Sequence, residues 1–258
     1  MAMRRGRGKR RGRGPRGRAL RGPAARRPLR RPAGAPAARR PRTRRPGTRR
    51  PRTRRPNANR IGVLISGRGS NLLAILDRID AGALDAEVAV VIGNEPEAAG
   101  LAAARRRGVR TAVVDHRKSP DRETHDRRMA EILEGAGVGL ICLAGYMRLL
   151  SPWFVRRFAG RILNIHPSLL PAFPGVDAHR QALRAGVKVS GCTVHFVDEG
   201  IDSGPIILQA AVPVLDDDTE QTLAARILKS EHVLYGRAIG LYFAGRLRIE
   251  GRRVLGAE

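Results

Sequence analysis

Two short polar segments hold the side chains best suited to chemistry. In the first, Asn164 and His166 are two residues apart and directly precede the proline-rich stretch that begins at Pro167. In an extended segment this spacing puts both side chains on one face. An amide donor and an imidazole can then act on the same atom, which suits stabilisation of a developing negative charge and proton transfer.

The second segment places Asp202 between Gly200 and Gly204 in an otherwise apolar region. An Asp that faced His166 would orient the imidazole and raise its basicity. The plainer alternatives are a structural His at the end of a strand and an Asp that accepts hydrogen bonds from turn N–H groups. The spacing alone leaves both interpretations open.

A third polar segment, the turn at residues 66–71 (Ser-Gly-Arg-Gly-Ser-Asn), follows a buried apolar run. Its glycines allow close backbone approach, and the start of the next helix offers unpaired N–H groups and the positive end of the helix dipole. The turn lacks the Gly-Lys-Ser/Thr of a Walker motif and is not a full GxGxxG. Phosphate binding and simple helix capping by Ser70 or Asn71 both fit this pattern.

These segments must be positioned by the elements around them. From Arg60 onward, short apolar runs alternate with amphipathic stretches, which predicts an α/β fold with an open, mostly parallel twisted sheet flanked by helices. We expect strands at residues 61–65, 88–92, 111–114, 138–144, 162–165, 187–197 and 205–214. We expect helices through residues 72–79, 98–107, 121–133, 178–183 and 219–243, and a closing hairpin at 247–255. Right-handed crossovers place the loops after parallel strands at one edge, where ligands bind.

The formal net charge of +27 lies almost wholly in residues 1–60, which hold 24 Arg, one Lys and no Asp or Glu. The remaining 25 Lys and Arg are nearly balanced by 23 Asp and Glu. Residues 1–57 are mostly Arg, Pro, Gly and Ala, a composition that predicts disorder. We expect a basic tail at 1–57 and one enzyme domain at 58–258. The tail fits an RNA or DNA tether, an organelle-targeting sequence, or G+C-rich DNA translated from a start codon assigned too early, the interpretation that we favour.

Cysteine usage and hydropathy point to the compartment. Only Cys142 and Cys192 occur, with no CxxC pair, which argues against a disulfide framework or a zinc cluster. The longest apolar run, 138–147, is about half of the ~20 residues that span a bilayer, and the N-terminus has no signal-peptide core. We expect a soluble, cytoplasmic protein that does not contact a membrane, and either a monomer or a homodimer.

Several strings in this order resemble the phosphoribosylglycinamide formyltransferase family. They are residues 65–71 (ISGRGSN), 143–152 (LAGYMRLLSP), 164–171 (NIHPSLLP), 173–175 (FPG), 193–197 (TVHFV) and 202–205 (DSGP). The resemblance implies a Rossmann-like formyltransferase fold and no metal. It also implies transfer of a formyl group from 10-formyltetrahydrofolate to the amine of glycinamide ribonucleotide. The products would be formylglycinamide ribonucleotide and tetrahydrofolate, in de novo purine (IMP) biosynthesis.

The resemblance also implies roles for single residues. Asn164, His166 and Asp202 match the catalytic group. The phosphate-holding positions are Gly69, Ser70 and Asn71, and Glu231 matches the residue that contacts the ribose. The folate pocket corresponds to Met147, Arg148, Leu149 and Leu150, with Arg122 where the acidic tail of the donor would lie. One departure is Leu228, where the family usually has Lys or Gln to help hold phosphate; we assign no role to the adjacent Lys229.

The other histidines divide into two groups. We expect His116, His125 and His232 to be surface or structural residues, and His179 and His195 to support the pocket or to contact substrate. Tyr146, Trp153 and Cys192 are expected to serve packing.

Three other functions compete with this interpretation. A formyltetrahydrofolate deformylase would use water as the acceptor, but that family normally has a regulatory domain ahead of the catalytic one and lacks the glycine-rich turn. A methionyl-tRNA formyltransferase would need a further C-terminal domain of about a hundred residues. In a nucleic-acid-binding protein the tail would be the working part; we regard nucleic acid as an unexpected partner.

Overall fold

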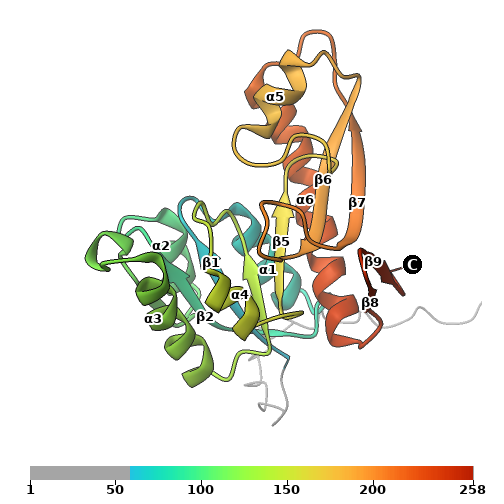
Figure 1. Ribbon diagram of the computed structural model, residues 1–258. Coiled ribbons are helices and arrows are strands. Elements are labelled where there is room, and N and C mark those ends of the chain that lie inside the picture. Colours follow the sequence, from blue (N-terminus) through green and yellow to red (C-terminus); the bar gives the residue numbers. More distant parts are fainter. Residues whose placement is uncertain (1–58, 258) are drawn as a thin grey trace, which may run out of the picture. The chain divides into compact units, whose positions relative to one another are not determined.

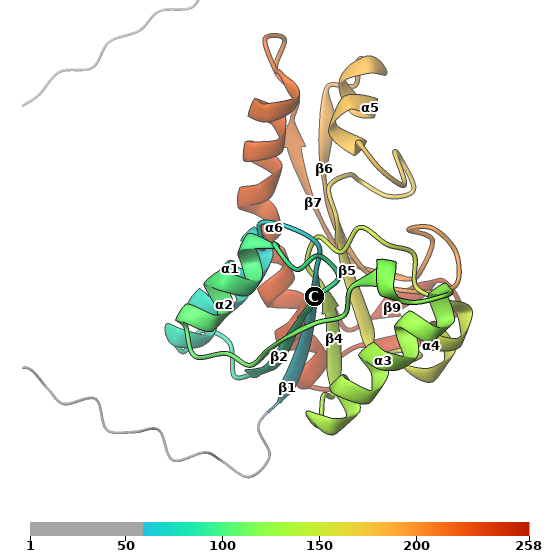
Figure 2. The same cartoon turned by 90° about the vertical axis from the view of Figure 1, so that its left-hand side faces the viewer.

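A computed structural model describes residues 59–257 of the chain. The tail predicted at residues 1–57 lies outside the described residues. Residues 59–257 form a nine-stranded sheet in the order β3-β2-β1-β4-β5-β6-β7-β9-β8, with helices against both faces (Figures 1 and 2). This confirms the predicted α/β class with an open, mostly parallel sheet.

The sheet consists of a parallel half and a mixed half. The strands are β1 (Arg60–Ile65), β2 (Glu87–Gly93), β3 (Thr111–Val113), β4 (Leu140–Leu143), β5 (Ile162–His166), β6 (Val189–Phe196), β7 (Ile206–Pro213), β8 (Arg248–Glu250) and β9 (Arg253–Leu255). Strands β3, β2, β1, β4 and β5 are mutually parallel. Strand β6 runs antiparallel to both β5 and β7. The antiparallel pairs need only a local connection, whereas each parallel pair needs a crossover.

The helices are α1 (Ser70–Asp80), α2 (Ala99–Arg106), α3 (Arg122–Gly135), α4 (Pro152–Arg157), α5 (Ala178–Arg184) and α6 (Glu220–Phe243), with a short 3-10 turn, η1 (His116–Lys118). Their starts follow local capping rules. Asp121, Ser151 and Thr219 precede α3, α4 and α6 and accept a hydrogen bond from a backbone N–H of the first turn. Among residues 59–257, no helix is both long and apolar enough to cross a membrane.

The structure adds elements and shortens others relative to the sequence prediction. Helix α4 and turn η1 were not predicted, although Ser151 followed by Pro152 is a helix-start signal. The strand expected at 138–144 is shorter, because Gly137 has φ 63° and the Val138 N–H bonds back to the Leu133 carbonyl at 3.1 Å. Val138 therefore belongs to the turn that follows α3 and not to β4.

Each face of the sheet has its own core. Along β1, Ile61, Val63 and Ile65 pack into one core with α1, α2 and α6, while Leu64 packs into the other with α3 and α4. All four side chains are fully or almost fully buried. A strand covered on both faces is apolar throughout, which explains why β1 reads as an unbroken apolar run.

The order of the strands locates the ligand-binding edge. Strand β1 pairs with β2 on one side and with β4 on the other. The chain continues from β1 to β2 and from β4 to β5, so the connections after these two neighbouring strands run in opposite directions along the sheet. In open α/β sheets, ligands bind at such a switch point, beyond the carboxyl ends of the strands. The polar turn after Ile65 and the loop after Leu143 both begin here.

Candidate active site

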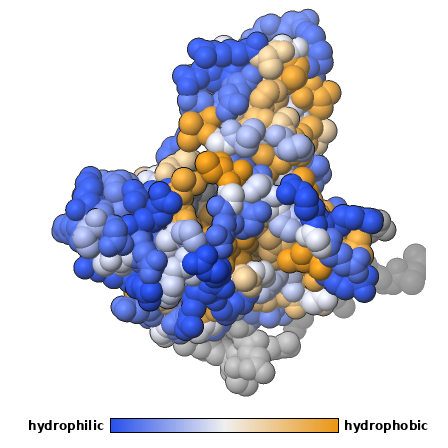
Figure 3. Space-filling view, in the orientation of Figure 1, coloured by the Kyte–Doolittle hydropathy of each residue, from blue (hydrophilic) through white to orange (hydrophobic). Residues whose placement is uncertain are grey.

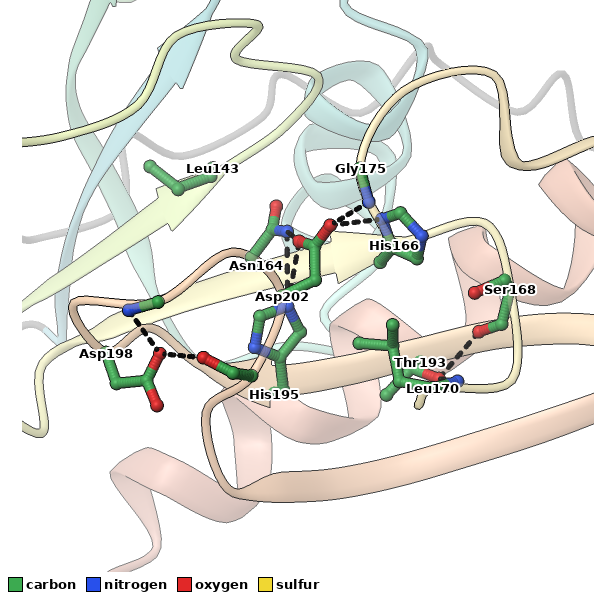
Figure 4. A network of polar contacts seen from close by, with 12 residues as sticks. Leu143, Asn164, His166, Ser168, Leu170, Gly175, Thr193, His195, Asp198 and Asp202 are labelled. Carbon is green, nitrogen blue, oxygen red and sulfur yellow. Dashed lines mark hydrogen bonds and ion pairs between the residues drawn. The ribbon is translucent and has the colours of Figure 1, made fainter. Parts of the chain in front are cut away.

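Asn164, His166 and Asp202 lie together beyond the end of β5 (Figure 4). The Asp202 Oδ1 atom accepts a hydrogen bond from Asn164 Nδ2 at 3.3 Å. Its Oδ2 atom is 3.2 Å from His166 Nδ1. One carboxylate therefore contacts both of the other side chains, as expected for a single polar cluster.

Strand geometry brings Asn164 and His166 to the same side. Between them, Ile165 is buried in the core on the opposite face. Asn164 pairs across the sheet with His195 of β6, and its Nδ2 lies 3.2 Å from His195 Nε2. The antiparallel partner strand thus adds a second histidine beside the amide.

Asp202 lies in the loop between β6 and β7 with a left-handed backbone, φ 49°. Its Oδ2 accepts a hydrogen bond from the Gly175 N–H at 2.8 Å. Burial raises the pKa of this carboxyl, but the hydrogen bonds from His195 and Gly175 and the charge of His166 outweigh burial, so the pKa is lowered. Asp202 is consequently ionised at neutral pH.

His166 is almost fully buried, and both of its ring nitrogens face acceptors. Its Nε2 is 2.9 Å from the Phe173 carbonyl oxygen, while Nδ1 faces Asp202. Burial lowers the pKa of the ring; the Phe173 carbonyl and the Asp202 carboxylate act in the opposite direction but do not cancel the effect of burial. The ring is held in place from both sides.

His195 has a fixed position as well. Its Nδ1 is 2.8 Å from the Phe196 carbonyl oxygen, and its Nε2 is 3.7 Å from Asp202 Oδ1. The Nε2 atom thus lies between the Asn164 amide and the Asp202 carboxylate. The expected supporting position of His195 matches this geometry.

The turn after β1 is shaped for close backbone approach. Gly69 has φ 74°, and a Cβ there would lie 3.0 Å from the Gly100 Cα. The Gly100 N–H donates to the Gly67 carbonyl at 3.0 Å. Gly69 is the N-cap of α1 and offers no side-chain acceptor, so the first N–H groups of this helix point toward the turn without a capping side chain.

Asn71 and Glu231 form a buried pair that joins α1 to α6. Asn71 Nδ2 donates to Glu231 Oε2 at 2.8 Å, while Asn71 Oδ1 is buried without a partner. Burial raises the pKa of Glu231, and the bond from Asn71 counteracts it only in part. Leu228 lies one turn before Glu231 and is partly buried. It carries no donor for an anion.

The loop between β4 and α4 is fixed at both ends. At its start, the Met147 N–H donates to Ser66 Oγ at 2.8 Å, and the Ser66 N–H donates to the Gly145 carbonyl at 3.0 Å. At its end, the Ser151 N–H donates to the buried carboxylate of Asp126. The residue after β1 therefore ties the glycine-rich turn to the loop that contains residues 147–150.

Between these anchors the loop presents apolar side chains to solvent. Met147 is 74% exposed and Leu149 is 51% exposed. Figure 3 shows an apolar surface in the middle of this view, below the upper region that contains α5 and the ends of β6 and β7 in Figure 1. Arg148 has a buried Nε atom without a partner, and Arg122 is exposed at the first position of α3.

Several contributors to the site received no individual role in the sequence analysis. Ser66, Asp126 and the Gly175 N–H act through bonds between segments far apart in the chain, whereas the Phe173 carbonyl contacts His166, seven residues before it. A Ser directly after a buried strand is the one clue that pattern analysis could have used. In the described range, no group of three or more His, Cys, Asp or Glu side chains could hold a metal ion.

The remaining predicted packing residues behave as expected. His125 is buried and bonds to Asp126 and to the Val114 carbonyl. Tyr146 packs into the core beside α3, and Cys192 is buried in the core beside α6.

Comparison with known proteins identifies the family of the chain. The family model for formyl transferases matches residues 59–239. The phosphoribosylglycinamide formyltransferase of Escherichia coli (strain K12) is 44% identical over 187 residues, which cover 72% of this chain and 88% of that protein. The crystal structure of glycinamide ribonucleotide transformylase 1 from Symbiobacterium toebii has 57% identity and a TM-score of 0.76, and the match covers 77% of this chain and 94% of that one.

A longer relative shares the same region. The trifunctional purine biosynthetic protein adenosine-3 of Drosophila melanogaster is 51% identical over 188 residues, but the chain spans only 14% of that protein's length. The chain is therefore similar to one part of the trifunctional protein and to nearly the whole of the bacterial enzyme. With the matched family model and these identities, the chain belongs to the formyl transferases, and among them to the phosphoribosylglycinamide formyltransferase family.

Proposed function

We propose that the chain transfers the formyl group of 10-formyltetrahydrofolate to the primary amine of glycinamide ribonucleotide, a step of purine biosynthesis, at the Asn164–His166–Asp202 cluster. The observation that carries this assignment is the Asp202 carboxylate in contact with both the Asn164 amide and the His166 ring. The family of the chain supports the reaction type.

Attack of an amine on a formamide carbon places negative charge on the formyl oxygen. Asn164 is the donor for this oxygen. Its two Nδ2 contacts, at 3.3 Å to Asp202 and 3.2 Å to His195, are long for hydrogen bonds. One N–H is therefore easily redirected to a substrate oxygen, where it stabilises charge that develops only during the reaction.

The reaction also requires a proton to move from the attacking amine to the departing folate nitrogen. His166 takes up the amine proton and, while protonated, adds positive charge beside the oxyanion; the same proton then passes to the folate nitrogen as the C–N bond to the formyl group breaks. Because burial lowers its pKa, the imidazolium is a stronger acid than an exposed one, which favours handing over its proton. Asp202, ionised and 3.2 Å from Nδ1, orients the ring and assists the transfer, directly or through water.

The glycine-rich turn is the place for the nucleotide phosphate. Gly69, Ser70 and Asn71 bring backbone N–H groups at the start of α1, and the helix dipole favours an anion there. Since Leu228 has no donor, these N–H groups carry more of the phosphate binding than in relatives with a polar residue at that position. Glu231, held by Asn71 at 2.8 Å, is placed to accept from ribose hydroxyls.

The loop at residues 147–150 is the place for the folate. Exposed apolar side chains at Met147 and Leu149 suit contact with a flat ring. Arg122 and Arg148 supply positive charge for the acidic tail of the donor. These assignments extend the same proposal to the second substrate.

An acceptor test distinguishes this function from hydrolysis. The full chain is incubated with 10-formyltetrahydrofolate, and loss of the formyl group is followed spectroscopically with and without glycinamide ribonucleotide. Consumption that requires the nucleotide, with formylglycinamide ribonucleotide as the product, supports the transferase. Equal consumption without nucleotide would make water the acceptor and the chain a deformylase.

A further inference from the structure

The loop that carries Asp202 is closed by a side-chain contact outside the reacting cluster. Asp198 Oδ1 accepts hydrogen bonds from Ser203 Oγ at 2.7 Å and from the Gly200 N–H at 3.1 Å (Figure 4). Both Asp198 and Ser203 are half-buried. The contact spans five residues and encloses Asp202, the residue directly before Ser203.

Two glycines of this loop approach neighbouring atoms closely. A Cβ at Gly204 would lie 1.9 Å from the Phe196 carbonyl oxygen, and a Cβ at Gly200 would lie 2.0 Å from Ser203 Oγ. Gly204 meets a backbone atom and therefore requires glycine, whereas a side chain at Gly200 would displace the Ser203 hydroxyl from its present position. The two glycines let the chain turn tightly, but glycine by itself fixes no single conformation.

Asp202 needs such fixation because its own backbone is unfavourable. At φ 49° it occupies the left-handed region, which costs an L-residue roughly 1–2 kcal/mol. On the carboxylate side, the Gly175 N–H holds Oδ2 at 2.8 Å. On the backbone side, the adjacent restraint is the bond from Ser203 to Asp198.

We propose that Asp198 and Ser203 are positioning residues for the reaction: their hydrogen bond holds Asp202 in the left-handed conformation that aims its carboxylate at Asn164 and His166. This inference rests on the proposed role of Asp202. Both act indirectly, through the backbone of Asp202, which lies between them in the chain.

The test compares full-length variants that break or keep the contact. Asp198→Ala and Ser203→Ala remove it, whereas Asp198→Asn keeps the Oδ1 acceptor and Ser203→Thr keeps the hydroxyl. A misplacement near 1 Å costs about a hundredfold in rate, so the alanine variants should lose about tenfold to a hundredfold in kcat and the conservative variants should recover most of it. The double alanine variant should be no slower than the slower single one, because both changes remove one contact.

A second readout does not depend on turnover. The Asp202 carboxylate raises the pKa of His166, so a carboxylate that drifts away in Asp198→Ala or Ser203→Ala should leave that pKa lower than in the unchanged protein, as followed by NMR of the ring protons. Glu199→Ala is the matched control, since Glu199 lies in the same loop but its exposed side chain pairs with Arg156 at 2.9 Å and takes no part in the Asp198–Ser203 contact. It should change neither kcat nor the pKa of His166.

The outcomes separate this inference from the proposed function. Unchanged kcat and an unchanged pKa of His166 in both alanine variants would overturn the positioning role. Equal loss in Ser203→Ala and Ser203→Thr would also overturn it, because the hydroxyl would then be irrelevant. If Asp202→Ala itself kept full turnover, the proposed function would fail, while the titration of His166 would still report whether the contact positions Asp202.

Discussion

The two ends of the site differ in the groups that form them: backbone groups at one end and side chains at the other. At the glycine-rich turn, in the parallel half of the sheet, the main contributors are backbone groups: the turn carbonyls, the N–H groups at the start of α1 and the close contact of Gly69 with Gly100. At the reacting cluster, where β5 meets the antiparallel β6, three side chains from separate segments meet. The first end should therefore depend on conformation and the second on residue identity.

The physical reason lies in strand direction. Parallel strands end together at one edge, where loops and helix starts present backbone dipoles. The antiparallel pairing of β6 with β5 places His195 opposite Asn164 and returns the chain so that Asp202 reaches the same side. Side chains from both strands then face one another.

The largest effect should come from deleting side chains of the reacting cluster. Asn164→Ala removes the oxyanion donor and should lower kcat about 10²–10³-fold, and His166→Ala should lower it about 10²–10⁴-fold. Steady-state kinetics with both substrates measure these losses, and thermal unfolding confirms that the variants are folded. Turnover near the original level in either variant would remove that residue from the reaction.

At the other end, a change of backbone preference should matter more than loss of a functional group. Gly69→Ala adds a Cβ 3.0 Å from Gly100 at φ 74°. Because the left-handed conformation costs roughly 1–2 kcal/mol for alanine, the turn should relax, and KM for the nucleotide should rise about tenfold with a smaller change in kcat.

Gly82→Ala is the matched control for this prediction. Gly82 has φ 72° and nothing within 4 Å of an added Cβ, so it shares the backbone strain but lies at the far end of α1. It should lower stability and leave KM unchanged. A similar rise in KM in both variants would show that general strain, not the turn, weakens binding.

A smaller effect on substrate binding is expected at Ser66, which joins the glycine-rich turn to the loop at residues 147–150. Ser66→Ala removes the acceptor of the Met147 N–H and the donor to Asn94 Oδ1 at 2.6 Å. Net contributions of single hydrogen bonds are about 1 kcal/mol, so KM for the folate should rise about fivefold. Ser190→Ala serves as control, because the buried Ser190 Oγ has no partner. An equal KM in the two variants would mean that the Ser66 bonds do not hold the folate loop.

The smallest expected effect is a shift in the pKa of His166 when the charge of Asp202 is removed. Burial lowers the pKa of His166, and the Asp202 carboxylate partly counteracts this. Asp202→Asn should therefore lower the pKa of His166 further, as measured by NMR titration. A pKa that stayed the same or rose would contradict the contact between the two side chains.

The same group has a consequence for stability. The folded-state pKa of His166 lies below the unfolded value of about 6.5, so below that pH the unfolded chain binds more protons than the folded one. The contribution of His166 to stability is therefore lost as pH falls from about 6.5 through the lowered pKa. Denaturant unfolding at several pH values, compared with His166→Ala, tests this sign.

Local rules accounted for much of the fold. The strand expected at 61–65 and the helix expected at 219–243 correspond closely to β1 and α6. Local rules did not reveal η1, and the short helix α4 was missed although its Ser-Pro start is visible in the sequence. Short elements of three to six residues carry too little periodicity to stand out.

By itself the sequence determined the α/β class, the spacing that puts Asn164 and His166 on one face, and the glycine-rich turn, because each depends on residues close together in the chain. Tertiary structure decided the contacts among distant segments: Asp202 against His166, Asn71 against Glu231, and Ser66 against Met147. Hydrogen bonds between residues dozens of positions apart leave no periodic pattern, and only the packing of the strands, of α1 against α6 and of the β6–β7 loop against β5 brings their atoms within hydrogen-bonding distance.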